Sequence, residues 1–258
     1  GLADIAAALY FNVLHHNPKK PKDPDRDRLY VSPGHTAPVW YATLARAGYF
    51  PVEELQTLRK LGTRLQGHMD RLTVPGVESS AGSLGQGLSI ACGSAFAGKL
   101  NGKRYQTYCI LSDGEHDEGS IWEAASFAGH NKLEHLTAII DRNNIQIDGP
   151  TEEIMTKEPL RERYEAFGWH VLDIDGHNIE SVIDACNEAI AIVERPVCII
   201  AHTIPGKGVD YMEGDYRLHG SPPGKVETGA TRNPAVQRME AMDQLRTLGG
   251  KIDASDFS

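Results

Sequence analysis

Two apolar, strand-like runs, each followed by residues with a side-chain oxygen, constrain this chain more than any other feature. The first run spans Gln106–Leu111 and precedes Asp113 and Gly114. The second run spans Leu136–Asp141 and precedes Asn143–Asn144. Open α/β sheets place their ligands at the carboxyl ends of the strands, so we expect these polar residues to meet at one edge of a sheet. The sequence therefore predicts a ligand site at that edge.

The wider pattern predicts one α/β domain, residues 1–258, with a largely parallel sheet and helices on both faces. Short apolar runs between helical or loop segments are typical of buried parallel strands, and two more occur at His170–Ile174 and Val197–His202. Residues 225–258 are expected to form a C-terminal loop and helix. Helical periodicity marks Ala3–Leu14, Thr36–Ala47, Leu84–Leu100, Ser120–Leu133, Ile179–Val193 and Val236–Leu248.

The charge balance and the cysteines exclude several classes of protein. The 26 Lys and Arg against 35 Asp and Glu give a net charge of -9, which argues against a nucleic-acid or anionic-membrane surface. No apolar run approaches the roughly 20 residues that span a bilayer, and no signal peptide is visible. The four cysteines lie far apart in apolar runs, which predicts buried reduced thiols and a cytoplasmic protein: Cys92, Cys109, Cys186 and Cys198.

The residues at the two strand ends match the chemistry of a magnesium–diphosphate site. Magnesium takes hard oxygen ligands, with one or two carboxylates and with phosphates and water completing the shell. Asp113 supplies a charge, and Asn143 supplies a carbonyl without a second full negative charge beside a diphosphate. Gly114 lets the backbone approach the phosphates, and a helix that begins near Gly119 points its amino end at them. Local spacing alone leaves an alternative to a cofactor site open: Asp113 could cap a helix and Asn143 could lie in a tight turn.

The segment from Ser112 to Asn143 resembles the thiamine diphosphate-binding motif, in which Gly-Asp-Gly is followed at a distance by Asn. More narrowly, the chain resembles transketolase in four ordered stretches. Two positions depart from the family pattern, because Ser112 replaces the usual first glycine and Ser83 the usual proline. The four stretches are Asp27–His35 (DRLYVSPGH), Pro75–Gly87 (PGVESSAGSLGQG), Asp113–His130 and Thr203–Gly220, which starts TIPGKG and ends HG.

The resemblance implies a cofactor, a metal and the residues that hold them. The cofactor would be thiamine diphosphate, and the metal Mg²⁺. Asp113, Asn143 and the backbone carbonyl of Ile145 would bind the metal. Contacts to the cofactor would come from His35, Gly82, Ser83, Leu84, Gly114, Asn143 and His219.

The resemblance also implies catalytic residues. His35, His68 and His219 would face the sugar, and imidazoles there can donate hydrogen bonds and move protons near neutral pH. Glu118 and Glu123 match acidic residues at the family's subunit interface, where they belong to a hydrogen-bonded link between active sites. We expect structural roles for the other histidines considered: His15, His16, His130, His135, His170, His177 and His202.

The resemblance covers only part of a transketolase. In the family, a glutamate on a second, pyrimidine-binding domain activates the cofactor, and this chain stops soon after His219. We therefore expect the amino-terminal subunit of a split transketolase, active with a carboxy-terminal partner in an α2β2 assembly. An excised domain of a longer chain is the alternative, and residues upstream of Gly1 are expected because it opens directly into a helical pattern.

The predicted reaction is transfer of a two-carbon ketol unit from a ketose or its phosphate to an aldose or its phosphate, as in the pentose phosphate pathway. Two enzymes that share the cofactor motif are rivals: 1-deoxyxylulose-5-phosphate synthase and the keto-acid dehydrogenase type of subunit. The contexts of His68 and His219 favour transketolase. A non-catalytic regulatory protein that retains the fold is a rival of another class.

Overall fold

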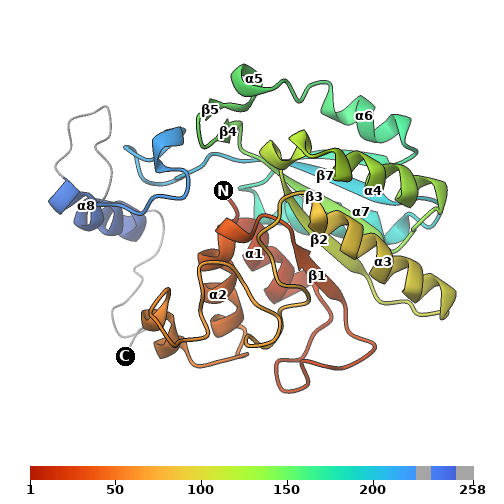
Figure 1. Ribbon diagram of the computed structural model, residues 1–258, viewed down its shortest axis with the longest axis horizontal. Coiled ribbons are helices and arrows are strands. Elements are labelled where there is room, and N and C mark those ends of the chain that lie inside the picture. Colours follow the sequence, from red (N-terminus) through yellow and green to blue (C-terminus); the bar gives the residue numbers. More distant parts are fainter. Residues whose placement is uncertain (225–233, 248–258) are drawn as a thin grey trace.

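A five-stranded parallel sheet forms the centre of the computed structural model, which describes residues 1–224 and 234–247 (Figure 1). The strand order is β1-β2-β3-β7-β6, and every neighbouring pair is parallel. A separate antiparallel pair, β4 and β5, follows β3. The strands are β1 (Arg28–Val31), β2 (Thr107–Ser112), β3 (Leu136–Arg142), β4 (Ile145–Gln146), β5 (Gly149–Pro150), β6 (His170–Asp175) and β7 (Val197–His202). The predicted parallel sheet is confirmed.

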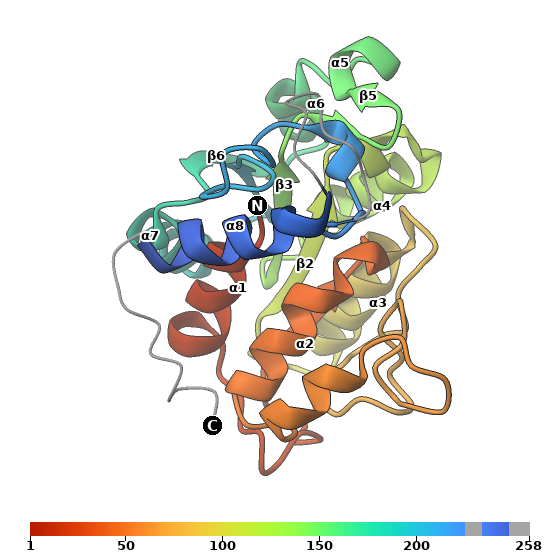
Figure 2. The same ribbon diagram turned by 90° about the vertical axis from the view of Figure 1, so that its left-hand side faces the viewer.

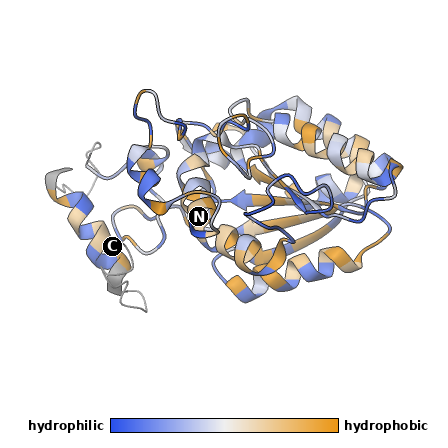
Figure 3. Ribbon diagram, turned by 90° about the horizontal axis from the view of Figure 1, so that it is seen from below, coloured by the Kyte–Doolittle hydropathy of each residue, from blue (hydrophilic) through white to orange (hydrophobic). Residues whose placement is uncertain are grey.

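Helices cover both faces of the sheet, as the sequence predicts (Figures 1 and 2). Along β2, Tyr108 and Ile110 pack in the core with α1, α2 and α7, whereas Cys109 and Leu111 pack in the core with α3, α4 and α6. This alternation follows from the two-residue period of a strand. The helices are α1 (Ala3–Ala8), α2 (Ala37–Arg46), α3 (Gln86–Leu100), α4 (Gly119–His130), α5 (Thr151–Ile154), α6 (Leu160–Ala166), α7 (Ile179–Ala191) and α8 (Pro234–Thr247). The central strands are mostly hydrophobic in Figure 3.

The pairing of β2 with β3 brings the two predicted ligand segments together. In the register of this pair, Ser112 lies opposite Asp141. Asp113 and Asn143 therefore leave the sheet at the same edge, one at the end of each neighbouring strand. Ser112 stands where the family has glycine, and it is the last residue of an ordinary strand, so its backbone there does not require glycine.

Several elements differ from the sequence prediction. The predicted helix over Ala3–Leu14 begins as α1 and continues as a π-helical turn, η1 (Leu9–Val13). The strands β1, β4 and β5 and the short helices α5 and α6 were not predicted. The helix α8 begins two residues before the predicted C-terminal helix, whose last residue, Leu248, lies outside the described residues. Of the predicted C-terminal loop and helix over residues 225–258, residues 225–233 and 249–258 lie outside them too. Four further short 3-10 turns are η2 (Gly34–Thr36), η3 (Val52–Thr57), η4 (Gly114–Asp117) and η5 (Tyr216–Leu218).

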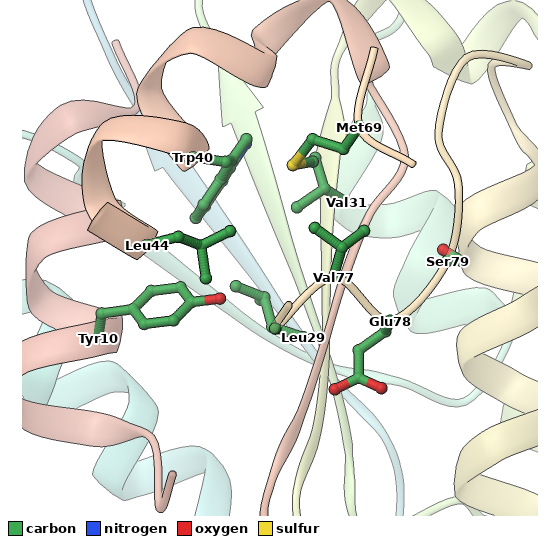
Figure 4. Close-up of a pocket in the computed structure, with 10 residues that line it drawn as sticks. Tyr10, Leu29, Val31, Trp40, Leu44, Met69, Val77, Glu78 and Ser79 are labelled. Carbon is green, nitrogen blue, oxygen red and sulfur yellow. The ribbon is translucent and has the colours of Figure 1, made fainter. Parts of the chain in front are cut away.

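Three other findings concern the cysteines, the helices and the packing of the core. All four cysteines are buried and free, as predicted. Within the described part of the chain, no helix is both long and apolar enough to cross a membrane. A gap of about 10 Å³ lies between η1, β1, α2 and the loop that carries Val77 and Glu78 (Figure 4). It has room for about one water molecule, so it is a packing gap and not a ligand site.

Candidate functional site

A cavity of about 410 Å³ opens at the carboxyl ends of β2 and β3. This size falls within the roughly 300–1,000 Å³ of small-molecule sites. Asp113 and Asn143 do not line it and are 0% and 9% exposed, although Asp113 lies in the chain between two lining residues, Ser112 and Gly114. The cavity brings together most of the other predicted site residues, namely His35, His68, Gly82, Leu84, Gly114, Ile145 and His219. Its remaining lining residues are Ser112, Glu115, Gln146, Ile147, Asp148, Ile154 and Gly220.

Besides Asp113 and Asn143, three further predicted residues do not line the cavity. Ser83 is exposed in the loop before α3. Glu118 and Glu123 are exposed at the start and on the outer surface of α4. Gly85 has a φ of 78°, and a side chain there would lie 2.7 Å from Cβ of Glu118, so α3 and α4 begin side by side. The acidic pair therefore marks a surface beside the cavity and not its interior.

The carboxylate of Asp113 is held by three donors. The backbone N–H of Gly114 donates to Oδ1 at 2.7 Å, and Asp113 is thereby the cap of η4. The N–H of Asn144 and Nη1 of Arg142 donate to Oδ2 at 2.7 and 3.0 Å. Burial raises the pKa of Asp113, and the N–H of Asn144 and the guanidinium of Arg142 oppose that rise. A cation placed at this carboxylate would favour its charged form further.

The side chain of Asn143 is fixed by the end of β3. Its Nδ2 donates to Oδ2 of Asp141 at 3.0 Å, and its Oδ1 accepts from the N–H of Ile145 at 3.1 Å. Asn144 has a φ of 64°, which Asn tolerates better than most residues. The structure therefore contains the features of the alternative interpretation, in which Asp113 caps a helix and Asn143 lies in a tight turn. They are compatible with metal binding, because an amide or carboxylate oxygen that accepts one hydrogen bond keeps a lone pair.

The oxygen atoms at this site fit a magnesium ion with a diphosphate. They belong to the carboxylate of Asp113, the carboxamide of Asn143 and the backbone carbonyl of Ile145, and Mg²⁺ takes hard oxygen ligands of these kinds. Gly114 lies against Gln146, where a Cβ would come within 2.9 Å of Cγ, so a side chain at position 114 would collide with the cavity wall. Gln146 Oε1 is buried without a hydrogen-bond donor, an acceptor that a bound molecule or its water could satisfy.

The three predicted histidines lie together across the cavity. The rings of His35 and His219 have centroids 5.1 Å apart at 49°. Gly34 permits the approach of His68, because a Cβ there would come within 2.5 Å of that ring. Burial, with the neighbouring imidazoles, lowers the pKa of His35 to about 4, and burial lowers the pKa of His219. Both rings are therefore neutral near pH 7, each with one donor and one acceptor.

Glu115 is a cavity residue that the sequence did not predict. Its side chain accepts from the N–H groups of Ser112 and Gly85 at 3.3 and 3.4 Å, and Ser32 also bonds it. Burial raises its pKa to about 7. The only sequence signal for Glu115 is its position two residues after Asp113 in the motif. That position does not show whether its side chain points toward the cavity.

The rim of the cavity is apolar and exposed. Leu84 is 37% exposed, Ile154 47% and Ile147 75%, and Met155 beside Ile154 is 58% exposed. Apolar side chains gathered around a cavity mark a surface that binds a ligand or another protein. The cavity thus has a buried polar side and an apolar side open to solvent.

Comparisons with known proteins agree with this site. The model of the transketolase, thiamine diphosphate binding domain family matches residues 1–239. A 6-deoxy-6-sulfo-D-fructose transketolase subunit, SqwG, from Clostridium sp. (strain MSTE9) is 46% identical over 218 residues, covering 84% of this chain and 79% of that protein. An apulose-4-phosphate transketolase subunit from Phocaeicola vulgatus is 40% identical, covering 93% of this chain and 85% of that protein.

Solved structures also show similarity to transketolases. A variant transketolase from Pichia stipitis, in complex with fructose 6-phosphate, superposes with a TM-score of 0.82 at 32% identity. The transketolase from Campylobacter jejuni gives 0.81 at 34% identity. This chain spans 40% and 41% of those two chains, and it spans 35% of the human transketolase, to which it is 40% identical.

The fold and the site define a thiamine diphosphate-binding domain of the transketolase type. The chain belongs to the transketolase family, whose members are transferases. It corresponds to the N-terminal, cofactor-binding part of these enzymes. Its similarity over most of the length of two separate subunits supports a split-subunit arrangement.

Proposed function

We propose that this chain is the N-terminal subunit of a split transketolase that transfers a two-carbon ketol unit between sugars. The observation that carries the proposal is one cavity where the segment after β2, the segment after β3 and three histidines meet. The chain would bind thiamine diphosphate with Mg²⁺. When bound, the cofactor supplies a stabilised carbanion equivalent, and the protein's part is to bind, orient and polarise.

The buried side of the cavity would hold the metal and the diphosphate. Asp113, Asn143 and the carbonyl of Ile145 would bind Mg²⁺, and Gly114 would let the diphosphate approach the backbone. Gly82, Ser83 and Leu84 would lie near the aminopyrimidine, although the exposure of Ser83 makes its backbone the better candidate for contact.

The histidines would act on the substrate and the diphosphate. His35 and His219 are neutral near pH 7, so each can donate one hydrogen bond to a phosphate or carbonyl oxygen and accept one from a hydroxyl. His68 would face the sugar in the same cavity. Neutral imidazoles at this place can hold or pass a proton at the reacting carbonyl without adding a fixed charge.

We infer that a separate C-terminal subunit with a pyrimidine-binding domain completes the site. The exposed apolar rim supports this inference, because a covering subunit would remove it from water. Glu118 and Glu123 lie exposed at the start and on the outer surface of α4 and would belong to the link between active sites. We propose an α2β2 assembly in the cytoplasm.

The substrates we propose are sugars with an anionic group. The names of the two subunit relatives give 6-deoxy-6-sulfo-D-fructose and apulose 4-phosphate, which carry a sulfonate and a phosphate. A xylulose 5-phosphate donor would place the enzyme in the pentose phosphate pathway. A panel of these three donors with a common aldose acceptor would identify the ketose.

The test of the proposed function uses the chain assembled with its partner subunit. Calorimetry should show thiamine diphosphate binding that requires Mg²⁺, and a coupled assay should show ketol transfer to an aldose phosphate. Absence of magnesium-dependent cofactor binding would overturn the proposal. Decarboxylation of pyruvate without ketol transfer would instead favour the 1-deoxyxylulose-5-phosphate synthase or keto-acid dehydrogenase reaction.

A further inference from the structure

Arg142, the last residue of β3, is a buried cation to which the proposed function assigns no part. Its side chain is 4% exposed. Nη1 donates to Oδ2 of Asp113 at 3.0 Å and to Oγ1 of Thr151 at 2.9 Å. Nη2 donates to Oε1 of Glu152 at 2.8 Å and to Oε1 of Glu158 at 3.0 Å. The four Nη hydrogens are all used, so the guanidinium is held in one orientation.

These contacts leave the two oxygens of Asp113 unequal. Oδ2 accepts two hydrogen bonds, from Arg142 and from the N–H of Asn144. Oδ1 accepts from the N–H of Gly114. A carboxylate oxygen has about two lone-pair directions, so Oδ2 is filled and Oδ1 keeps one. Oδ1 is the oxygen that a metal ion can approach.

The other arm of the guanidinium reaches the segment that carries one lining residue of the cavity. This segment, residues 151–158, is here called the wall segment, and Ile154 within it lines the cavity. Glu152 accepts from Arg142 and also from the backbone N–H of Lys157 at 3.1 Å, which closes the wall segment on itself. Arg142 is therefore hydrogen-bonded both to the proposed metal ligand and to the wall segment.

The charges explain why a guanidinium is tolerated so near a proposed metal site. A lone cation beside Mg²⁺ would be repelled, but Glu152 and Glu158 carry opposite charge on its outer side. Arg presents a planar fork that can bond several carboxylates at once, whereas Lys presents a single point of charge. The arrangement therefore depends on the shape of Arg142 and not only on its charge.

We propose that Arg142 is a positioning residue that turns Oδ1 of Asp113 toward the metal and couples metal binding to the ordering of the wall segment. This inference rests on the proposed function, because it requires Asp113 to be a metal ligand. It adds a regulatory consequence, since the wall of the cavity would tighten when metal and cofactor bind. The contacts of Asp113 and Glu152 with one guanidinium carry the inference.

The experiment uses the chain assembled with its partner and Mn²⁺ as the metal probe at fixed thiamine diphosphate. Electron paramagnetic resonance of free Mn²⁺ gives the dissociation constant. Arg142→Met should raise that constant by about 10- to 100-fold, the range for a group that orients a metal ligand, and Arg142→Lys should fall between it and the wild type. Hydrogen exchange should show metal-dependent protection of the wall segment in the wild type and not in Arg142→Met.

Lys157→Met is the matched control. Lys157 is a second buried cation on the wall segment, with its side chain 1% exposed, and it pairs with Asp117 and with the carbonyl of Met155. It does not contact Asp113. Its loss should lower the melting temperature of the cofactor-free protein, as the loss of Arg142 should, but should leave the Mn²⁺ dissociation constant within about threefold of the wild type.

The outcomes separate this inference from the proposed function. A wild type that binds no Mn²⁺ with the cofactor overturns both. A wild type that binds, with Arg142→Met and Lys157→Met weakened alike or Arg142→Met not weakened, overturns only the role of Arg142. Should Arg142→Met fail to fold, Arg142→Lys and Glu158→Gln serve in its place, and equal metal affinity in both and the wild type would reject the inference.

Discussion

On the side of β2 and β3, the polar groups around the cavity are buried and hydrogen-bonded to one another, whereas Leu84, Ile147 and Ile154 bound the other side with exposed apolar surface. We call these the braced side and the open side. The polar groups of the braced side make these hydrogen bonds within the chain, so the contacts do not depend on a partner. The open side has apolar atoms in water, so its final form depends on what covers it. The contrast supports the proposal that this chain binds the metal and the diphosphate and that a partner completes the cavity.

The largest expected effect is on the braced side. Asp113→Asn keeps the shape of the side chain but removes the charged metal ligand, and magnesium-dependent binding of thiamine diphosphate should weaken at least about 100-fold. Calorimetry on the assembled protein measures it. Asp184→Asn, at an exposed position on α7, is the control and should bind as the wild type does. Unchanged affinity in Asp113→Asn would remove this residue from the metal site.

The second prediction concerns pH and the buried Glu115. Burial raises its folded-state pKa to about 7 from an ordinary value of 4.5, so its contribution to stability is present below pH 4.5 and is lost as pH rises through 7. For a shift of this size the loss between pH 5 and 8 is about 2 kcal/mol. Glu115→Gln should lack this loss in urea unfolding of the cofactor-free chain. Parallel pH curves for the two proteins would contradict the prediction.

The third prediction tests whether His68 contacts the sugar or belongs to the braced side that holds the cofactor. His68→Ala should lower kcat/KM for the ketose about 10-fold or more, because an imidazole that can bond the sugar is lost, while cofactor affinity stays within about threefold. Steady-state kinetics and calorimetry separate the two. His130→Ala, at the exposed end of α4, is the control. A cofactor defect as large as the kinetic one would move His68 to the diphosphate.

The smallest expected effect is on the open side. Ile147 is 75% exposed, and Ile147→Glu should weaken association with the partner about 10-fold through loss of apolar burial. The melting temperature of the separate chain should not change, because the side chain is already in water. Val193→Glu, at a position 69% exposed beyond α7, should associate normally. Sedimentation velocity measures association, and equal affinities would argue that the rim at Ile147 stays uncovered.

The sequence predicted the braced side in outline because the relevant signals are local. Asp113 and Asn143 each follow an apolar run, and strand ends in a parallel sheet share an edge. Arg142 was missed because its partners lie 9 to 29 residues away and only the fold brings them together. Glu115 was missed for a similar reason, since Gly85, one of its donors, is 30 residues distant.

Elements were predicted where their periodicity is strong. The strand β1 was missed because it is four residues long and begins with Arg28, and its place follows only from pairing with β2. The π-helical turn at Leu9–Val13 keeps an apolar pattern that cannot be told from an α-helix by spacing. The roles of Glu118, His35 and the other site residues stay predictions, and their positions are what the structure adds.

The register of β2 with β3 has a consequence for the life of the protein in a cell. Asp113 and Asn143 follow two strands that are joined through α4, so the proposed pair of ligands is absent from any chain in which these strands have not yet paired. A cofactor that binds only the paired state stabilises it by about 2.7 kcal/mol at 100 times its dissociation constant. Scarcity of cofactor would then lower the amount of folded chain that survives proteolysis, and not only the rate at which each molecule turns over.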